Sequence, residues 1–244
     1  MLLTISLGLQ RVAGVTVVLM SAAVVLGHVL GDPTIESHDD RAKFVEEVEN
    51  AADRIPVVYA FQVLEVATAL VALAAGLGLY LLVRERARAA ALAGLLLFVL
   101  SGVFHAGTGI VGAGMIRAAD DYTGGGLAGI GHGSEELLEL IRVLAVLHFA
   151  NFLSGFATFG FGAAAFAYAL AWPGALAPRW LGWLGVVAGA LLVLTPLAVT
   201  AEVLFLPFFF GAIMTVVWGL AAGLWLISRR EAANVEPAQP TGSH

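Results

Sequence analysis

The sequence contains no cysteine and only one lysine, Lys43, among its 244 residues. The absence of cysteine excludes disulfides, thiolate metal sites and thiol nucleophiles. Charged residues make up 12% of the chain, whereas soluble domains average about a quarter. The net charge of −6 and the lack of a basic stripe argue against nucleic acid as a partner.

Long apolar runs are abundant instead. Hydrophobic residues make up 60% of the chain and the mean hydropathy is +0.92. Because about 20 apolar residues cross a bilayer, we predict an all-α polytopic membrane helix bundle with six transmembrane helices. The predicted spans are about 9–30, 57–83, 89–116, 137–172, 180–200 and 203–228, which together form one domain over residues 1–230. A flexible polar tail is expected over residues 231–244. The wealth of Ala, Gly, Val and Leu, with Arg in place of Lys, is typical of a GC-rich prokaryotic genome.

Basic residues predict the orientation of the chain. Arg84, Arg86 and Arg88 crowd the short loop between the second and third spans. The same side receives Arg11, Arg179, Arg229 and Arg230. Since positive charge is retained on the cytoplasmic side, both termini are predicted to be cytoplasmic, in the inner membrane of the cell. The long acidic loops then lie on the outer side.

The loop between the first and second spans predicts a further helix. Its apolar residues Phe44, Val48, Ala51 and Ile55 recur at helical spacing, and the rest of the loop is acidic. This pattern indicates an amphipathic helix on the outer surface. Its acidic face is either simply solvated or a surface that collects cations or docks a partner. The second outer loop, 117–136, is rich in glycine and is either an ordinary connector or a lid, and Ser134 is expected to cap the helix that follows it.

Three ionisable side chains interrupt the apolar spans: Glu65, His105 and His148. Such groups are costly inside a bilayer and mark functional sites. Counted from the outer boundary at 1.5 Å per residue, Glu65 is about 13 Å deep, His105 about 18 Å and His148 about 9–14 Å. We therefore expect the three to form one layer in the outer half of the bundle.

Four interpretations of this layer remain open. Glu65, His105 and His148 can form a 2-His-1-carboxylate site for a transition metal. His105 and His148 can ligate a b-type haem or another pigment between two helices. The same groups can line a proton or cation path, or they can join helices through hydrogen bonds without further function. The expected supporting residues around the layer are Gln62, Asn151, His28 and Glu202.

Glycine motifs predict close helix contacts. Gly185-x-x-x-Gly189 and Gly219-x-x-x-Gly223 are small-x-x-x-small patterns on the last two spans. Such faces let helix backbones approach each other. They serve either packing within the chain or contact with a protein partner or a second copy.

Two stretches resemble a known family. Gln10-Arg11-Val12-Ala13-Gly14 and the segment Ala177-Pro178-Arg179-Trp180-Leu181-Gly182-Trp183-Leu184-Gly185 are similar to those of small prokaryotic integral membrane proteins classed as a domain of unknown function. The resemblance implies the six-helix layout and carries no functional residues.

The prediction for function is an integral membrane subunit or binding module with a buried polar site, surrounded by the lipid bilayer and holding bound lipid. An enzyme is not expected, because no catalytic motif is present. The alternatives are a membrane redox protein that binds haem, pigment or a non-haem metal through His105 and His148, and a proton or cation transporter.

Overall fold

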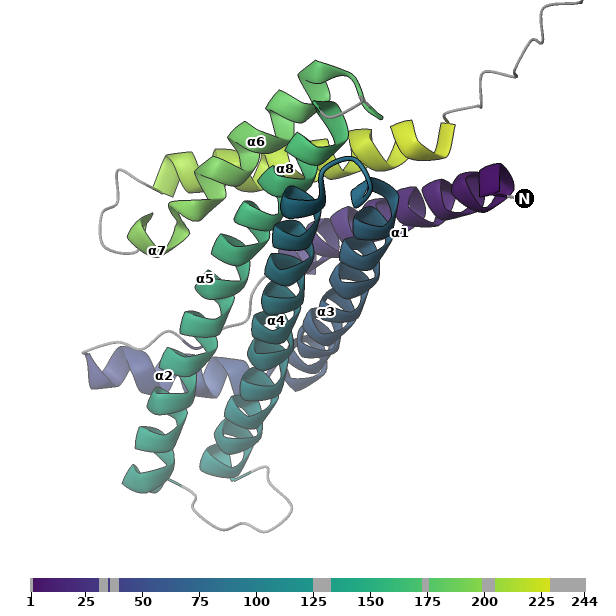
Figure 1. Cartoon of the computed structure of the whole chain (residues 1–244). Helices are drawn as coiled ribbons and strands as arrows, with labels where there is room; N and C mark the ends of the chain where they lie inside the picture. Colours follow the sequence, from purple (N-terminus) through teal and green to yellow (C-terminus); the bar gives the residue numbers. More distant parts are fainter. Residues whose placement is uncertain are drawn as a thin grey trace, which may run out of the picture.

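The computed structural model describes residues 2–30, 35, 40–124, 133–172, 176–198 and 205–228, and in these ranges the regular structure is entirely helical (Figure 1). The helices are α1 (Leu2–Leu30), α2 (Arg41–Ala52), α3 (Ile55–Val83), α4 (Arg88–Thr123), α5 (Glu135–Ala171), α6 (Arg179–Val193), α7 (Thr195–Ala198) and α8 (Phe205–Ser228). Six spans in the described ranges are long and apolar enough to cross a membrane: α1, α3, α4, α5, α6 continued by α7, and α8. The predicted all-α bundle of six spans is confirmed.

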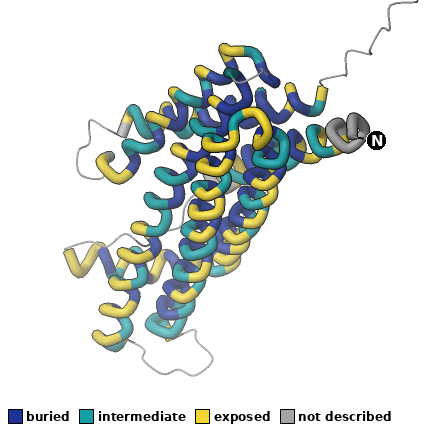
Figure 2. The backbone as a smooth tube through the Cα atoms, viewed as in Figure 1, coloured by how far each residue is buried: buried dark blue, intermediate teal, exposed yellow. Residues whose placement is uncertain are grey.

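The six spans close into a ring in chain order. Each packs on the next, from α1 to α3, α4, α5, α6 and α8, and α8 packs on α1. In Figure 1, α3, α4 and α5 run side by side, while α1 and α8 lie together across one end of them. The helix α2 crosses the other end, which we call the α2 end; the opposite end carries the α3–α4 turn, residues 84–87. Figure 2 shows the buried positions along the facing sides of these helices.

Glycine allows the closest helix contacts of the ring. A Cβ atom built on Gly14 of α1 would lie 2.7 Å from the carbonyl oxygen of Gly223 in α8. A side chain on Gly189 of α6 would collide with the carbonyl oxygen of Gly160 in α5. Gly185 and Gly219 are likewise covered, by Trp218 and Ser21 respectively. The two predicted glycine motifs therefore pack within the chain, and an oligomer formed through them stays a prediction.

The amphipathic helix predicted between the first two spans is α2. Asp40 caps it, because its Oδ1 accepts the backbone N–H of Ala42 at 2.9 Å. Its apolar residues Phe44 and Val48 are fully buried against the α2 ends of the spans. The residues that cover them include Val58, Met115, Ile116, Leu138 and Ile141. The apolar face of α2 thus packs on protein, and its acidic face is exposed. Ile55 does not belong to this helix but begins α3, with Pro56 in the first turn.

The helices α4 and α5, with 36 and 37 residues, are longer than a bilayer crossing requires. α4 continues beyond the predicted end at Ile116, because Arg117 pairs with Asp120 and Asp121 at 3.5 and 3.2 Å and thereby stabilises another turn. The helix ends at Gly124, whose φ of 87° few other residues adopt. A helix of 36 residues is about 54 Å long, well over the roughly 30 Å of bilayer hydrocarbon. Ser134 caps α5 as predicted, since its Oγ accepts the N–H of Leu137 at 3.1 Å.

Candidate functional site

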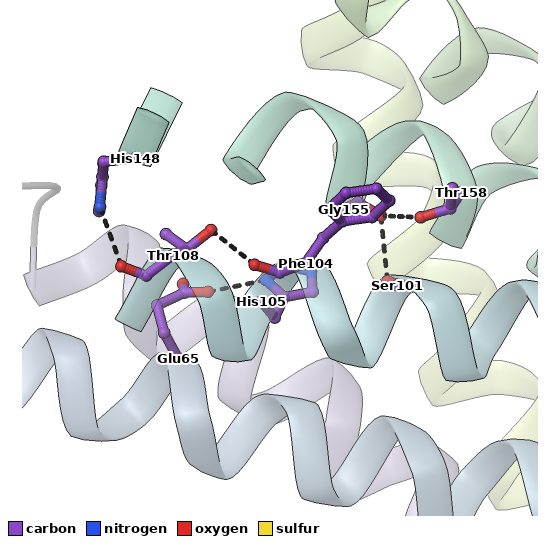
Figure 3. A network of polar contacts seen from close by, with 8 residues as sticks. All are labelled: Glu65, Ser101, Phe104, His105, Thr108, His148, Gly155 and Thr158. Atoms are coloured by element: carbon purple, nitrogen blue, oxygen red, sulfur yellow. Dashed lines mark hydrogen bonds and ion pairs between the residues drawn. The ribbon is translucent and has the colours of Figure 1, made fainter. Parts of the chain in front are cut away.

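A buried carboxyl and a buried imidazole meet between α3 and α4 (Figure 3). The Oε2 atom of Glu65 lies 2.7 Å from Nδ1 of His105. Their side chains are only 10% and 6% exposed, so water screens this contact weakly. When Glu65 is a carboxylate, the Nδ1–H of His105 donates to it, and the bond fixes the orientation of the ring. The remaining ring nitrogen, Nε2, is then directed away from Glu65 and towards α5.

Two glycines explain why these side chains meet. Gly102 and Gly109 lie about one turn to either side of His105 on the same face of α4. A Cβ built on Gly109 would lie 2.8 Å from the carbonyl oxygen of Gln62, and one on Gly102 would lie 3.3 Å from that of Ala69. Because both glycines lack a side chain, α4 approaches the backbone of α3 closely. The spacing Gly102-x-x-His105-x-x-x-Gly109 therefore brings His105 within hydrogen-bond distance of the carboxyl on α3.

The imidazole of His105 borders a small cavity. The cavity has a volume of about 10 Å³, close to the space of one water molecule. It is lined by Met20, Val24, Thr68, Ala72, His105, Phe156 and Phe159. Phe156 meets the His105 ring edge-on, with ring centroids 5.7 Å apart. The polar pair thus faces a space that separates it from α1, and aromatic rings from α5 form the wall of that space.

Gln62, expected as a supporting residue, lies one turn from Glu65 towards the α2 end. It is 3% exposed, and its side chain packs directly on Gly112 of α4. Its Oε1 atom is buried and has no hydrogen-bond partner. None of the described hydrogen bonds joins Gln62 to Glu65 or His105. Gln62 therefore lies on the same face of α3 as Glu65, and its Oε1 is a buried acceptor without a partner one turn from the pair.

His148 reaches a different partner. It is fully buried on α5, and its Nδ1–H donates to the backbone carbonyl of Thr108 at 3.0 Å (Figure 3). Thr108 lies one turn from His105, and its own hydroxyl donates to the carbonyl of Phe104. A histidine that donates to a helix carbonyl joins two helices. His148 thus fastens α5 to α4 beside the Glu65–His105 pair.

The residues of the predicted layer therefore have different partners: Glu65 pairs with His105, and His148 bonds to the backbone of α4. Among the residues that the structure describes, no three His, Cys, Asp or Glu side chains form a group that could hold a metal ion. The structure therefore gives no support to a metal at Glu65, His105 and His148, or to a haem between the two histidines. Asn151 packs against Gly107 of α4 rather than against the pair. The side chain of His28 and all of Glu202 lie outside the described residues.

Sequence reasoning did not identify three residues that shape the site. Phe156 separates the cavity at His105 from the rest of the bundle. Ser101 donates to the carbonyl of Gly155 at 3.0 Å and holds α5 against α4 one turn from His105. A Cβ on Gly155 would lie 3.3 Å from Nε2 of His105, so glycine lets α5 approach this edge of the ring closely. The glycines around His105 were visible in the sequence, but their facing partners were not.

The ring of six apolar helices and the buried carboxyl–imidazole pair define an integral, multi-pass membrane protein. The chain belongs to the family described as "Domain of unknown function (DUF4386)", whose model matches residues 12–229. This match confirms the resemblance drawn from the first and fifth spans. No curated protein and no solved structure matches the chain.

Proposed function

We propose that this protein is a membrane-embedded binding module and that the Glu65–His105 pair is its binding site. The observation that carries the proposal is a carboxyl and an imidazole in contact at 2.7 Å, both about nine-tenths buried, beside a cavity. Ionisable groups inside a membrane are expensive and mark functional sites. Glu65 orients the ring, which leaves Nε2 of His105 to bind a small polar group.

The alternatives have less support. Haem or metal binding through His105 and His148 needs the Nε2 atoms of both rings to face one centre, because each Nδ1–H is engaged by a carboxyl on α3 or a carbonyl on α4. Among the described residues, no three His, Cys, Asp or Glu side chains form a group that could hold a metal ion. A proton or cation path needs a continuous line of polar groups to water. The described wall of the cavity is mostly apolar, with Thr68 and His105 as its polar members. Binding without transport therefore fits the site best.

A test of the proposal is to identify what the protein retains from the membrane. The protein would be excised with its native lipids by a copolymer, extracted with organic solvent, and its small molecules counted by mass spectrometry. We expect one species at close to one copy per chain in the wild type, and its loss in Glu65→Ala and His105→Leu.

The matched control is Thr195→Ala, which removes a buried hydroxyl that donates to the carbonyl of Leu192, outside the site. The proposal is wrong if all four proteins retain the same molecules in the same amounts.

We also propose that both termini and the α3–α4 turn are cytoplasmic and that α2 is on the outer side of the inner membrane. The support is the Arg84, Arg86 and Arg88 cluster at that turn. The chain lacks cysteine, so single cysteines can be labelled without background. In cells with a permeabilised outer membrane, an impermeant maleimide should label Glu46→Cys on α2 and leave Glu85→Cys unlabelled until the cells are lysed. The reverse pattern would invert the orientation.

A further inference from the structure

An apolar groove opens between the first and last spans. It has a volume of about 370 Å³, within the range of about 300–1,000 Å³ that is usual for small-molecule sites. It is lined by Val24, Val25, Phe208, Phe209, Ala212, Ile213, Val216 and Val217. Its rim residues Val25, Phe209, Ile213 and Val217 are between 43% and 49% exposed. Because these residues belong to membrane-spanning segments, the groove opens towards lipid.

The groove continues inwards through two small cavities. Val24, Ala212 and Val216 line both the groove and a cavity of about 10 Å³ that also contains Ser21 and Thr215. That cavity shares Val24, Phe156 and Phe159 with the cavity at His105. A line of adjoining spaces therefore runs from the lipid-facing surface of α1 and α8 to the imidazole.

Phe156 lies in the wall that the two small cavities share, together with Val24 and Phe159. Its ring meets His105 on one side at 5.7 Å and Phe208 of α8 on the other at 6.0 Å. Both contacts are edge-to-face, and Phe152 packs against the same ring at 4.8 Å. We expect that a rotation of the Phe156 ring would connect the two small cavities, since this ring lines both.

The site selects the chemistry of an occupant. A charged head group would be costly to bury in the inner cavities, because Val, Ala, Leu, Met and Phe side chains form most of their walls. The inner cavities admit only a small head. A hydroxyl can both donate and accept, so it suits Nε2 of His105 in either protonation state. The groove suits an alkyl chain.

We propose that a neutral long-chain lipid with a hydroxyl head enters between α1 and α8, places its chain in the groove and bonds its head to His105. This inference rests on the proposed function and names the ligand class of the same site. The bilayer supplies the ligand laterally, so the site needs no opening to water.

The experiment uses the full-length protein in proteoliposomes with a hexadecanol that carries a diazirine in its chain. After irradiation, mass spectrometry locates the label. We expect labelled peptides from α8, residues 206–217, and from α1. Unlabelled hexadecanol should compete about tenfold better than hexadecane, since one hydrogen bond distinguishes them. Hexadecanoic acid should compete less well than hexadecanol. Equal competition by hexadecane or by the acid would overturn the proposal, and this comparison needs no variant.

Variants separate the route from the site. Ala212→Phe fills the groove where it meets the first cavity and should remove most of the labelling. The matched control, Ala150→Phe, adds the same ring at an exposed position of α5 and should leave labelling unchanged. Unchanged labelling in Ala212→Phe with loss in His105→Leu would overturn the route alone and leave the proposed function standing. Loss in Ala212→Phe with full labelling in His105→Leu would overturn the role of the pair.

Discussion

The regions around His105 and His148 contain the same buried side chain with different surroundings. His105 meets a carboxyl from the neighbouring helix and borders a cavity. His148 donates to the backbone carbonyl of Thr108, which every residue type offers. Thr108, the partner of His148, lies one turn from His105 on α4.

This difference teaches that burial alone does not identify a functional histidine. A ring whose Nδ1–H binds a backbone carbonyl needs no other ionisable group, so it can serve as a helix contact anywhere in a bundle. A ring that binds a carboxyl requires a second costly residue on another helix. The requirement for two such residues favours His105 as the functional histidine.

The largest effect is expected from breaking the pair. Glu65→Ala leaves the His105 ring without its carboxyl and should lower the free energy of unfolding by about 3–5 kcal/mol, the usual cost of removing one partner of a buried pair. Steric trapping in bilayers would measure it. Glu65→Gln, which keeps an acceptor, should lose less. In the double variant Glu65→Ala/His105→Leu, part of the stability should return; strictly additive losses would show that the two residues do not interact.

Separating the helices beside His105 should have the next largest effect. Gly109→Ala places a methyl group 2.8 Å from the carbonyl oxygen of Gln62 and should cost about 1–3 kcal/mol in unfolding free energy. Gly114→Ala is the matched control, since a Cβ there has nothing within 4 Å. The control should gain up to about 1 kcal/mol from helix propensity. Equal effects at both positions would contradict the close approach of α3 and α4.

A smaller effect is expected at the second histidine. His148→Leu approximately keeps the volume and removes the bond to Thr108, so we expect a loss of about 0.6 kcal/mol and at most about 1.7 kcal/mol, the average and the largest value measured for hydrogen bonds between membrane helices. The molecule retained by the wild type should remain bound. If His148→Leu loses the retained molecule as completely as His105→Leu does, both histidines belong to one binding site, and the contrast drawn between them is wrong.

The smallest effect is expected at Asn151. It is partly exposed and packs on Gly107, away from the pair. Asn151→Ala should change the unfolding free energy by less than about 0.5 kcal/mol and leave ligand retention unchanged. A tenfold loss of retention would instead show that Asn151 supports the site, as its position one turn from His148 suggested.

The sequence predicted the spans and part of the site, for physical reasons that differ. Hydropathy reports the length of an apolar run directly, so the six spans were visible, as was α2 from the spacing of Phe44, Val48 and Ala51. The depth of a residue along a helix follows from the number of residues to the helix end, so Glu65 and His105 could be placed in one layer. The rotation of one helix about its axis relative to its neighbour cannot be obtained by counting residues. His148 has a suitable depth but a different direction, and only the packed structure reveals it. The groove between α1 and α8 was equally hidden, because it joins residues from opposite ends of the chain.

The closure of the ring by α8 on α1 has a consequence for biosynthesis. Membrane helices are inserted before they associate laterally. One wall of the groove belongs to α1 and the other to α8, so a nascent chain does not contain the groove until α8 has been made. The Glu65–His105 pair needs only α3 and α4 and can form on a half-made chain. A nascent protein can therefore join the two side chains of its costly polar pair before the lipid-facing entrance to that pair exists.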